Sequence, residues 1–169
     1  ILRCLVGSEM CIRDREYTYP QGKYKVVTGI TNETEAPAIF KHKGTYYLLG
    51  SGSSGWKPNA ARIFTSKSIT GDYTEKSNPC HGVNPYNGLG PEKTFGGQSS
   101  FIIPVQGKKN SYIAMFDIWK PEMPIEGLYI WLPIKIQTNS INIKWRDEWN
   151  LNIFSDEKKI IPPLPTSIY

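Results

Sequence analysis

A pattern of two paired runs, found twice along the chain, limits the possible folds more than anything else in the sequence. The segment EAPAIFKHKGTYYLLGSGSSGW starts at Glu35, and QSSFIIPVQGKKNSYIAMFDIW starts at Gln98, 63 positions later. Each begins with a polar residue whose side chain carries a carbonyl group and ends on a tryptophan, Trp56 or Trp119. In between lie an apolar run, a turn with Lys and Gly, and a second run rich in Tyr and aliphatic residues. This spacing is slightly above the usual repeat period of about 20–50 residues, and it still indicates one repeated supersecondary unit.

The residues outside these segments supply further short strands. ARIFTSKS and GDYTEKSN lie between the two segments, and GLYIWLPIKIQ and INIKWRDEW follow the second one. Ten Tyr, five Trp, six Phe, 15 Gly and 13 Pro suit short strands joined by tight turns. Four short strands per unit are the content of a β-propeller blade. The sequence therefore predicts an all-β fold, a propeller first and a β-sandwich as the competing architecture.

Glu35 and Gln98 occupy the same place in successive units. In a propeller the innermost strand of each blade lines the central channel, so we expect both residues to face one pocket at the channel mouth. Pro37 suits the beginning of a strand, and we expect it to hold Ala36 in an extended conformation. Taken alone, Glu35 has a second interpretation, a solvated charge that caps a strand end. The shared position favours a functional role.

The first fifteen residues, ILRCLVGSEMCIRDR, fit nothing downstream. The string LVGSEMCIRDR resembles a translated sequencing adapter. We therefore expect residues 1–15 to be a non-native leader, unstructured and dispensable, that stands in place of a missing N-terminal part. Residues 16–169 are then the partial propeller. A secretory signal is expected on the missing part, so the location predicted for the intact protein is secreted or periplasmic.

Few residues are suited to binding a metal ion or another cofactor. If Cys4 and Cys11 belong to a non-native leader, Cys80 is the remaining cysteine, and His42 and His81 are the two histidines. Neither a metal site nor a cofactor site is predicted from them. The net charge is +5, but basic residues are scattered among acidic ones, which argues against nucleic acid as a partner. No run of about 18 apolar residues exists, so no membrane-spanning helix is predicted.

Several motifs in this order resemble glycoside hydrolase family 43, and within it the exo-β-1,3-galactanase (galactan 1,3-β-galactosidase) branch. They are EAPAIFKHKGTYYLLGSG, SGWKPNAAR, TFGGQSSFIIPV, DIW, YIWLPI and WRDEWNL. The resemblance implies a five-bladed propeller. Five blades of about 60 residues need roughly 300 residues, so we expect this chain to be the C-terminal part, about three blades. Where neighbouring blades are absent, we expect the apolar side chains of Tyr46, Leu48 and Ile113 to meet solvent. A channel cation such as calcium is implied by the resemblance alone.

The resemblance implies that Glu35 is the general acid and that Gln98 stands where a catalytic base is expected. Glycoside hydrolysis needs a proton on the leaving oxygen and, for inversion, a water activated on the opposite face of the sugar. A carboxyl group at an enclosed channel mouth loses hydration, which favours the protonated form. A neutral amide orients water through its oxygen but holds a proton poorly. Two alternatives stay open: Gln98 relays the proton through an imidic-acid tautomer, or a carboxylate from the missing part acts as the base.

The same segments offer residues for binding the sugar. An indole presents a flat apolar face to a sugar ring and an N–H to a hydroxyl, which suits Trp56 and Trp119, although packing between blades is the alternative. The polar candidates are Ser53, Ser54, Asn59 and Asp117. The serines and Asn59 suit turn geometry equally well. The remaining tryptophans, Trp131, Trp145 and Trp149, are predicted to pack within or between blades.

These observations predict a glycosidase that cleaves a galactose-containing polysaccharide with inversion and is monomeric at full length. Arabinofuranosidase or galactofuranosidase activity is the alternative within the enzyme class. A non-catalytic carbohydrate-binding propeller is the alternative from another class. Because only about half a propeller is expected here, we predict that the chain by itself is inactive.

Overall fold

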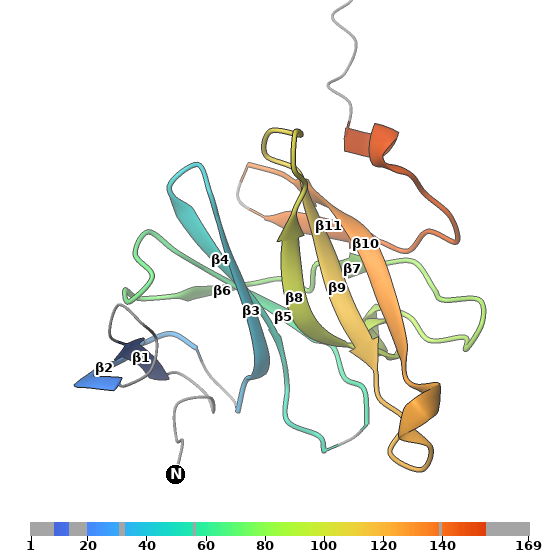
Figure 1. Cartoon of the computed structure of the whole chain (residues 1–169), viewed down its shortest axis with the longest axis horizontal. Helices are drawn as coiled ribbons and strands as arrows, with labels where there is room; N and C mark the ends of the chain where they lie inside the picture. The colour runs from blue at the N-terminus through green and yellow to red at the C-terminus, as the bar shows by residue number, and fades with distance from the viewer. Residues whose placement is uncertain (1–8, 14–19, 31–32, 56, 139, 155–169) are drawn as a thin grey trace, which may run out of the picture.

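A computed structural model of the chain describes residues 9–13, 20–30, 33–55, 57–138 and 140–154. These residues form an all-β structure of two large sheets and one small one (Figure 1). Helical structure in this part of the chain is confined to short 3-10 segments: η1 (Pro91–Gly96), η2 (Pro124–Glu126) and η3 (Leu151–Phe154). No helix within the described ranges is long and apolar enough to cross a membrane.

The first large sheet is an antiparallel meander of four strands. It contains β3 (Glu35–His42), β4 (Thr45–Ser51), β5 (Ala61–Ser66) and β6 (Thr74–Lys76), hydrogen-bonded in that order. The β3–β4 turn includes Gly44 at φ +78°, a conformation that glycine adopts at low cost. These are the strands predicted from the first repeat, and a four-stranded meander is the structure of a propeller blade.

The second large sheet repeats the meander and adds one edge strand. It contains β8 (Gln98–Pro104), β9 (Tyr112–Ile118), β10 (Leu128–Ile136) and β11 (Ile141–Lys144), with β7 (Cys80–His81) pairing in parallel with β11. The strand order is β7-β11-β10-β9-β8. The repeat therefore corresponds to two similar sheets, and the strands predicted in both are confirmed.

The small sheet pairs β1 (Glu9–Arg13) with β2 (Pro20–Val26). The expectation that the leader is unstructured is therefore wrong for the five residues of β1. A local run with strand propensity pairs with the next such run along the chain, whatever its origin. The non-native origin of residues 1–15 stays a prediction. The expected number of about three blades is not confirmed, because the described residues form two sheets of blade type.

The two large sheets share one core. Strand β3 lies beside β8, so the first strands of the two repeats are neighbours (Figure 1). The buried side chains between the sheets include Phe40, Leu49 and Ile63 from the first sheet and Ala114, Phe116, Ile130 and Leu132 from the second. Full burial of each large aliphatic or aromatic side chain contributes about 1.5–3 kcal/mol. Tyr112 stacks at a tilt on Phe40 (4.7 Å between ring centroids) and its hydroxyl donates to the Lys41 carbonyl at 3.0 Å.

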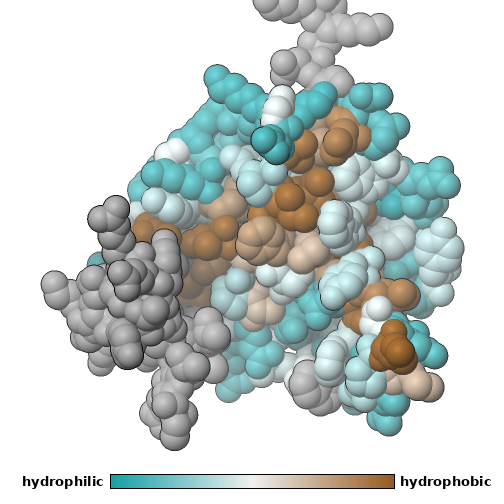
Figure 2. Space-filling view, in the orientation of Figure 1, coloured by the Kyte–Doolittle hydropathy of each residue, from teal (hydrophilic) through white to brown (hydrophobic). Residues whose placement is uncertain are grey.

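The prediction that Tyr46, Leu48 and Ile113 meet solvent is wrong for Leu48 and Ile113. Leu48 is buried in a second cluster with Phe64, Val27 and Tyr73. Val27 precedes the first sheet, and Tyr73 lies between β5 and β6. Ile113 is also buried, and Tyr46 is half-buried. The second sheet does expose apolar surface elsewhere, as on Phe101, which is 57% exposed. Figure 2 shows hydrophobic surface in the middle of this face, over β8 and β9.

Candidate active site

Glu35 and Gln98 are the first residues of β3 and β8, as the repeat predicted. Both strands depart from regular pairing directly afterwards, between Glu35 and Ala38 in one and between Ser99 and Phe101 in the other. Bulges of this kind redirect side chains and are frequent near active sites. Because β3 and β8 are neighbours, two residues 63 positions apart in sequence begin adjacent strands.

The backbone after Glu35 differs from the prediction. Ala36 has φ +51°, so the expectation that Pro37 holds it extended is wrong. The bulge turns the Ala36 carbonyl towards the other sheet, where the buried Ser99 hydroxyl donates to it at 2.6 Å. A non-glycine residue in the left-handed region costs about 1–2 kcal/mol. A contact between the sheets therefore maintains a strained conformation beside the candidate acid.

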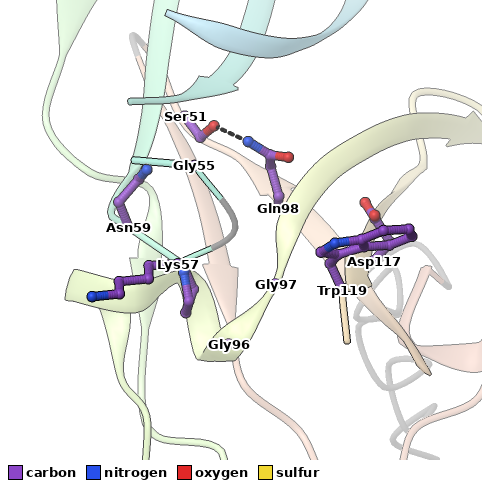
Figure 3. A pocket seen from close by; sticks show the side chains of 10 residues that line it. Ser51, Gly55, Lys57, Asn59, Gly96, Gly97, Gln98, Asp117 and Trp119 are labelled. Carbon is purple, nitrogen blue, oxygen red and sulfur yellow. Dashed lines mark hydrogen bonds between the residues drawn. The ribbon is translucent and has the colours of Figure 1, made fainter. Parts of the chain in front are cut away.

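Ser51 links the two candidate catalytic residues. It is the backbone pairing partner of Glu35, and its hydroxyl oxygen accepts a hydrogen bond from Gln98 Nε2 at 2.7 Å. The Ser51 hydroxyl also donates to the Gly52 carbonyl at 3.2 Å. Since the single hydroxyl proton goes to Gly52, Ser51 can only accept from Gln98. The Gln98 NH₂ group is thereby directed at Ser51, and its carbonyl oxygen points away (Figure 3).

The carboxylate of Glu35 has a hydrogen-bond donor beside it. Glu35 Oε1 accepts from the Ser53 hydroxyl at 2.8 Å, and Glu35 is half-buried while Ser53 is exposed. Ser53 therefore lies next to the candidate acid, in the loop that follows β4. Its hydroxyl remains within reach of solvent, so a sugar hydroxyl could contact the same pair.

A pocket of about 290 Å³ lies between the loop after β4 and the beginning of β8 (Figure 3). Of the predicted site residues, the pocket brings together Asn59, Gln98, Asp117 and Trp119. Glu35 is not among its lining residues and is connected to it through its pairing partner, Ser51. The sequence reasoning missed Ser51, Gly55, Lys57, Pro58, Gly96 and Gly97.

The amide of Asn59 maintains the shape of the loop after β4. Its Oδ1 accepts from the Gly52 N–H at 2.8 Å, and its Nδ2 donates to the Gly52 carbonyl and to the Ser54 hydroxyl, each at 2.7 Å. Ser54 in turn donates to the Lys57 carbonyl at 2.6 Å. Both donor hydrogens of the Asn59 amide are thus used inside the loop. This agrees with the alternative prediction, in which these residues shape a turn. Trp56 lies outside the described residues, so its predicted role stays a prediction.

Asp117 and Trp119 reach the pocket from the end of β9. Asp117 is the backbone pairing partner of Gln98, just as Ser51 is the backbone pairing partner of Glu35. Asp117 is half-buried and Trp119 is exposed, and both line the pocket. A carboxylate that accepts hydrogen bonds and an indole face are therefore available at the pocket wall.

The segment before Gln98 has an unusual backbone. Thr94, Phe95 and Gly96 have φ of +47°, +59° and +97°. Thr94 donates to the Asn59 carbonyl at 2.6 Å, which joins this segment to the loop after β4. At Gly97 an added Cβ would lie 2.9 Å from the Phe116 Cβ, so a side chain there would push β8 away from β9. The paired glycines before Gln98 were the sequence signal for this close approach.

Metal-ligating side chains do not gather at the site. Within the described part of the chain, no group of three or more His, Cys, Asp or Glu side chains could hold a metal ion. Cys80 is buried in the core, and burial raises the pKa of its thiol to about 12, so the thiol stays protonated. The channel cation implied by the resemblance therefore has no ligand set among these residues.

The fold and site together define a class of protein. Two blade-type sheets meet at a small polar pocket that contains an amide with a fixed orientation and an aspartate, with an indole at its edge and a glutamate beside it. An indole next to hydroxyl-binding groups is suited to a sugar ring. The fold is therefore of propeller type, and the pocket has groups suited to a carbohydrate ligand.

Solved structures agree with this assignment. A family 43 β-1,3-galactosidase designated BT0265 is 30% identical to this chain, with a TM-score of 0.76. The match covers 88% of this chain and 30% of the galactosidase. A second, BT3683 with galactodeoxynojirimycin, is 37% identical with a TM-score of 0.73 over 84% of this chain and 39% of its own. An exo-β-1,3-galactanase from Phanerochaete chrysosporium with β-1,3-galactotriose is 25% identical with a TM-score of 0.63 over 80% of this chain and 29% of its own.

The predicted resemblance to glycoside hydrolase family 43 and its galactanase-like branch is thus confirmed. The chain corresponds to about a third of the length of these proteins, between 29% and 39%. No model of a protein family and no curated protein matches the chain.

Proposed function

We propose that this chain is the part of a five-bladed, inverting exo-β-1,3-galactanase-like enzyme that supplies the general acid Glu35 and the water-orienting residue Gln98. The observation that carries the proposal is the connection through Ser51, which pairs with Glu35 and accepts a hydrogen bond from Gln98. The solved structures of similar proteins with a galactose-type inhibitor or β-1,3-galactotriose support galactose as the sugar.

Glu35 supplies the proton to the leaving oxygen. A protonated glutamic acid has one O–H donor, and the leaving oxygen of the glycosidic bond is the acceptor. Ser53 donates to one carboxyl oxygen, Oε1, and so leaves the other to carry the proton. The strained Ala36 that follows Glu35 is held by Ser99 of the neighbouring sheet, which fixes the carboxyl group relative to Gln98.

Gln98 orients the attacking water through its carbonyl oxygen. Because the NH₂ group donates to Ser51, Oε1 is the part of the amide that is open to accept a hydrogen bond from water. The general base of an inverting enzyme, which accepts the proton of the attacking water, lies about 6.5–9.5 Å from the acid. That role falls either to the imidic-acid tautomer of Gln98 or to a carboxylate elsewhere in the longer protein. Trp119 stacks on the sugar, and Asp117 accepts from its hydroxyls.

The experiment is a comparison of the chain with a chimera. Residues 33–154 replace the matching segment of the 37%-identical β-1,3-galactosidase. Released galactose is measured on β-1,3-galactan, and released aryl alcohol is measured on aryl β-galactosides and aryl α-arabinofuranosides. We expect turnover of galactan by the chimera and none by the chain alone, because the pocket needs walls from the remaining blades. Preference for the arabinofuranoside would replace the substrate assignment, and a folded chimera that binds galactan without turnover would favour the non-catalytic alternative.

A further inference from the structure

A second hollow, larger than the pocket at Gln98, lies on the second sheet. It has a volume of about 800 Å³, and five of its lining residues are aromatic. Its rings are Tyr86, Tyr129, Trp131, Trp145 and Trp149. We call it the aromatic groove. The prediction that these tryptophans serve in packing holds for Trp145, which packs against the core, but Trp131 is 48% exposed.

The groove exists because β10 is longer than its partner. Strand β11 pairs with β10 only over Ile134–Ile136, whereas β9 pairs with it from Leu128. Within the described residues, the first part of β10 therefore has no strand on its outer side. The segments 145–149 and 84–87 lie across this space and form the other wall.

Internal hydrogen bonds hold two of the indoles in place. Trp149 Nε1 donates to the Trp131 carbonyl at 2.8 Å, and Trp145 Nε1 donates to Asp147 Oδ1 at 2.7 Å. Trp145 also packs on Phe95, with ring centroids 5.4 Å apart. Since these two indole N–H groups are already bonded, what Trp145 and Trp149 offer to a ligand is ring surface. Rings that are fixed before binding lose little conformational entropy when a ligand stacks on them.

The remaining rings are open and have polar neighbours. Tyr86 is 81% exposed and Tyr129 is 69% exposed. Charged side chains of Lys120, Arg146 and Glu148 also line the groove. A saccharide presents apolar C–H faces for stacking and hydroxyls for hydrogen bonds, so it matches both kinds of surface.

The groove and the pocket share a wall at the end of β9. Asp117 lines the pocket, and its pairing partner on β10, Tyr129, lines the groove, so the two side chains lie on the same face of the sheet. Building on the proposed function, we propose that the aromatic groove binds further sugar residues of the polysaccharide whose terminal sugar occupies the pocket. The groove then anchors the polymer at a distance from the bond that is cleaved.

Affinity electrophoresis of the full chain in gels containing soluble β-1,3-galactan tests this. We expect the chain to be retarded, and Tyr129→Ala and Trp131→Ala each to weaken binding roughly three- to tenfold, as expected for loss of one stacked ring. Tyr129→Phe keeps the ring and should bind like the parent chain. Phe101→Ala is the matched control, since Phe101 is on the same sheet, has an exposure between those of Trp131 and Tyr129, and does not line the groove.

Four results would overturn the proposal. They are an unretarded chain, equal weakening by Phe101→Ala, groove variants that bind like the parent chain, and a dimer by light scattering that Trp131→Ala dissociates. The last would show that a second copy covers the groove. Each result leaves the proposed function to be judged by turnover of the chimera. Conversely, a chimera without turnover would contradict the proposed function while retardation of the chain still supports binding in the groove.

Discussion

Replacing Ser51 by alanine tests the connection on which the site depends. The substitution removes a short neutral hydrogen bond from Gln98 Nε2 (2.7 Å) and a long one to the Gly52 carbonyl (3.2 Å). A neutral hydrogen bond contributes a net of about 0.5–1.5 kcal/mol, and an unsatisfied buried partner adds to the loss. Ser51 is buried while Gln98 is half-buried and can rotate towards water. We therefore expect Ser51→Ala to lower the free energy of unfolding by about 1–2 kcal/mol.

A double-mutant cycle separates the hydrogen bond from other losses. Unfolding by urea, followed by tryptophan fluorescence, is measured for Ser51→Ala, Gln98→Ala and the double variant. We expect a coupling free energy of about 1 kcal/mol, because each single substitution removes the same hydrogen bond. The control pairs Ser51→Ala with Ser100→Ala, whose exposed hydroxyl donates to the Met115 carbonyl at 3.1 Å, and these effects should add. Additive effects of Ser51→Ala and Gln98→Ala would refute the reasoning.

Three further predictions concern other parts of the chain. Ala36→Gly should raise the free energy of unfolding by up to about 1 kcal/mol by relieving φ +51°, whereas Ala38→Gly in the same strand should lower it. After Cys4→Ser and Cys11→Ser, a thiol reagent at pH 8 should not label Cys80, whose pKa burial raises to about 12, until the protein unfolds. Burial, and to a smaller extent the positive charge of Lys43, lowers the pKa of His42 from its usual 6.5. The free energy of unfolding should therefore fall as the pH drops through 6.5, and His42→Gln should reduce this loss.

The strands and the positions of Glu35 and Gln98 could be predicted because they depend on local pattern. The sequence shows where each strand begins and ends through the alternation of apolar and polar residues, the Gly-containing turns and the repeated unit. Neighbouring repeats then place their first residues side by side, as β3 and β8 show.

Other features depend on contacts that the sequence pattern does not reveal. The conformation of Ala36 is set by Ser99, and this tertiary contact overrides the local preference that Pro37 imposes. Ser51 is one of several serines near Gly residues, and only the pairing of β4 with β3 shows that it lies between Glu35 and Gln98. Leu48 is buried because Val27 and Tyr73 cover it.

The most direct test of the proposed mechanism is the effect of Glu35→Gln on substrates with different leaving groups in the chimera described above. Glutamine keeps the shape of the side chain but cannot donate the proton, and general acid catalysis is worth about 10²–10⁴-fold. We predict that turnover of β-1,3-galactan falls by that factor, while an activated aryl β-galactoside, whose leaving group needs little protonation, loses much less. Gln98→Ala should slow both substrates alike, because each needs the oriented water. Equal losses on both substrates in Glu35→Gln would contradict the assignment of Glu35 as the acid.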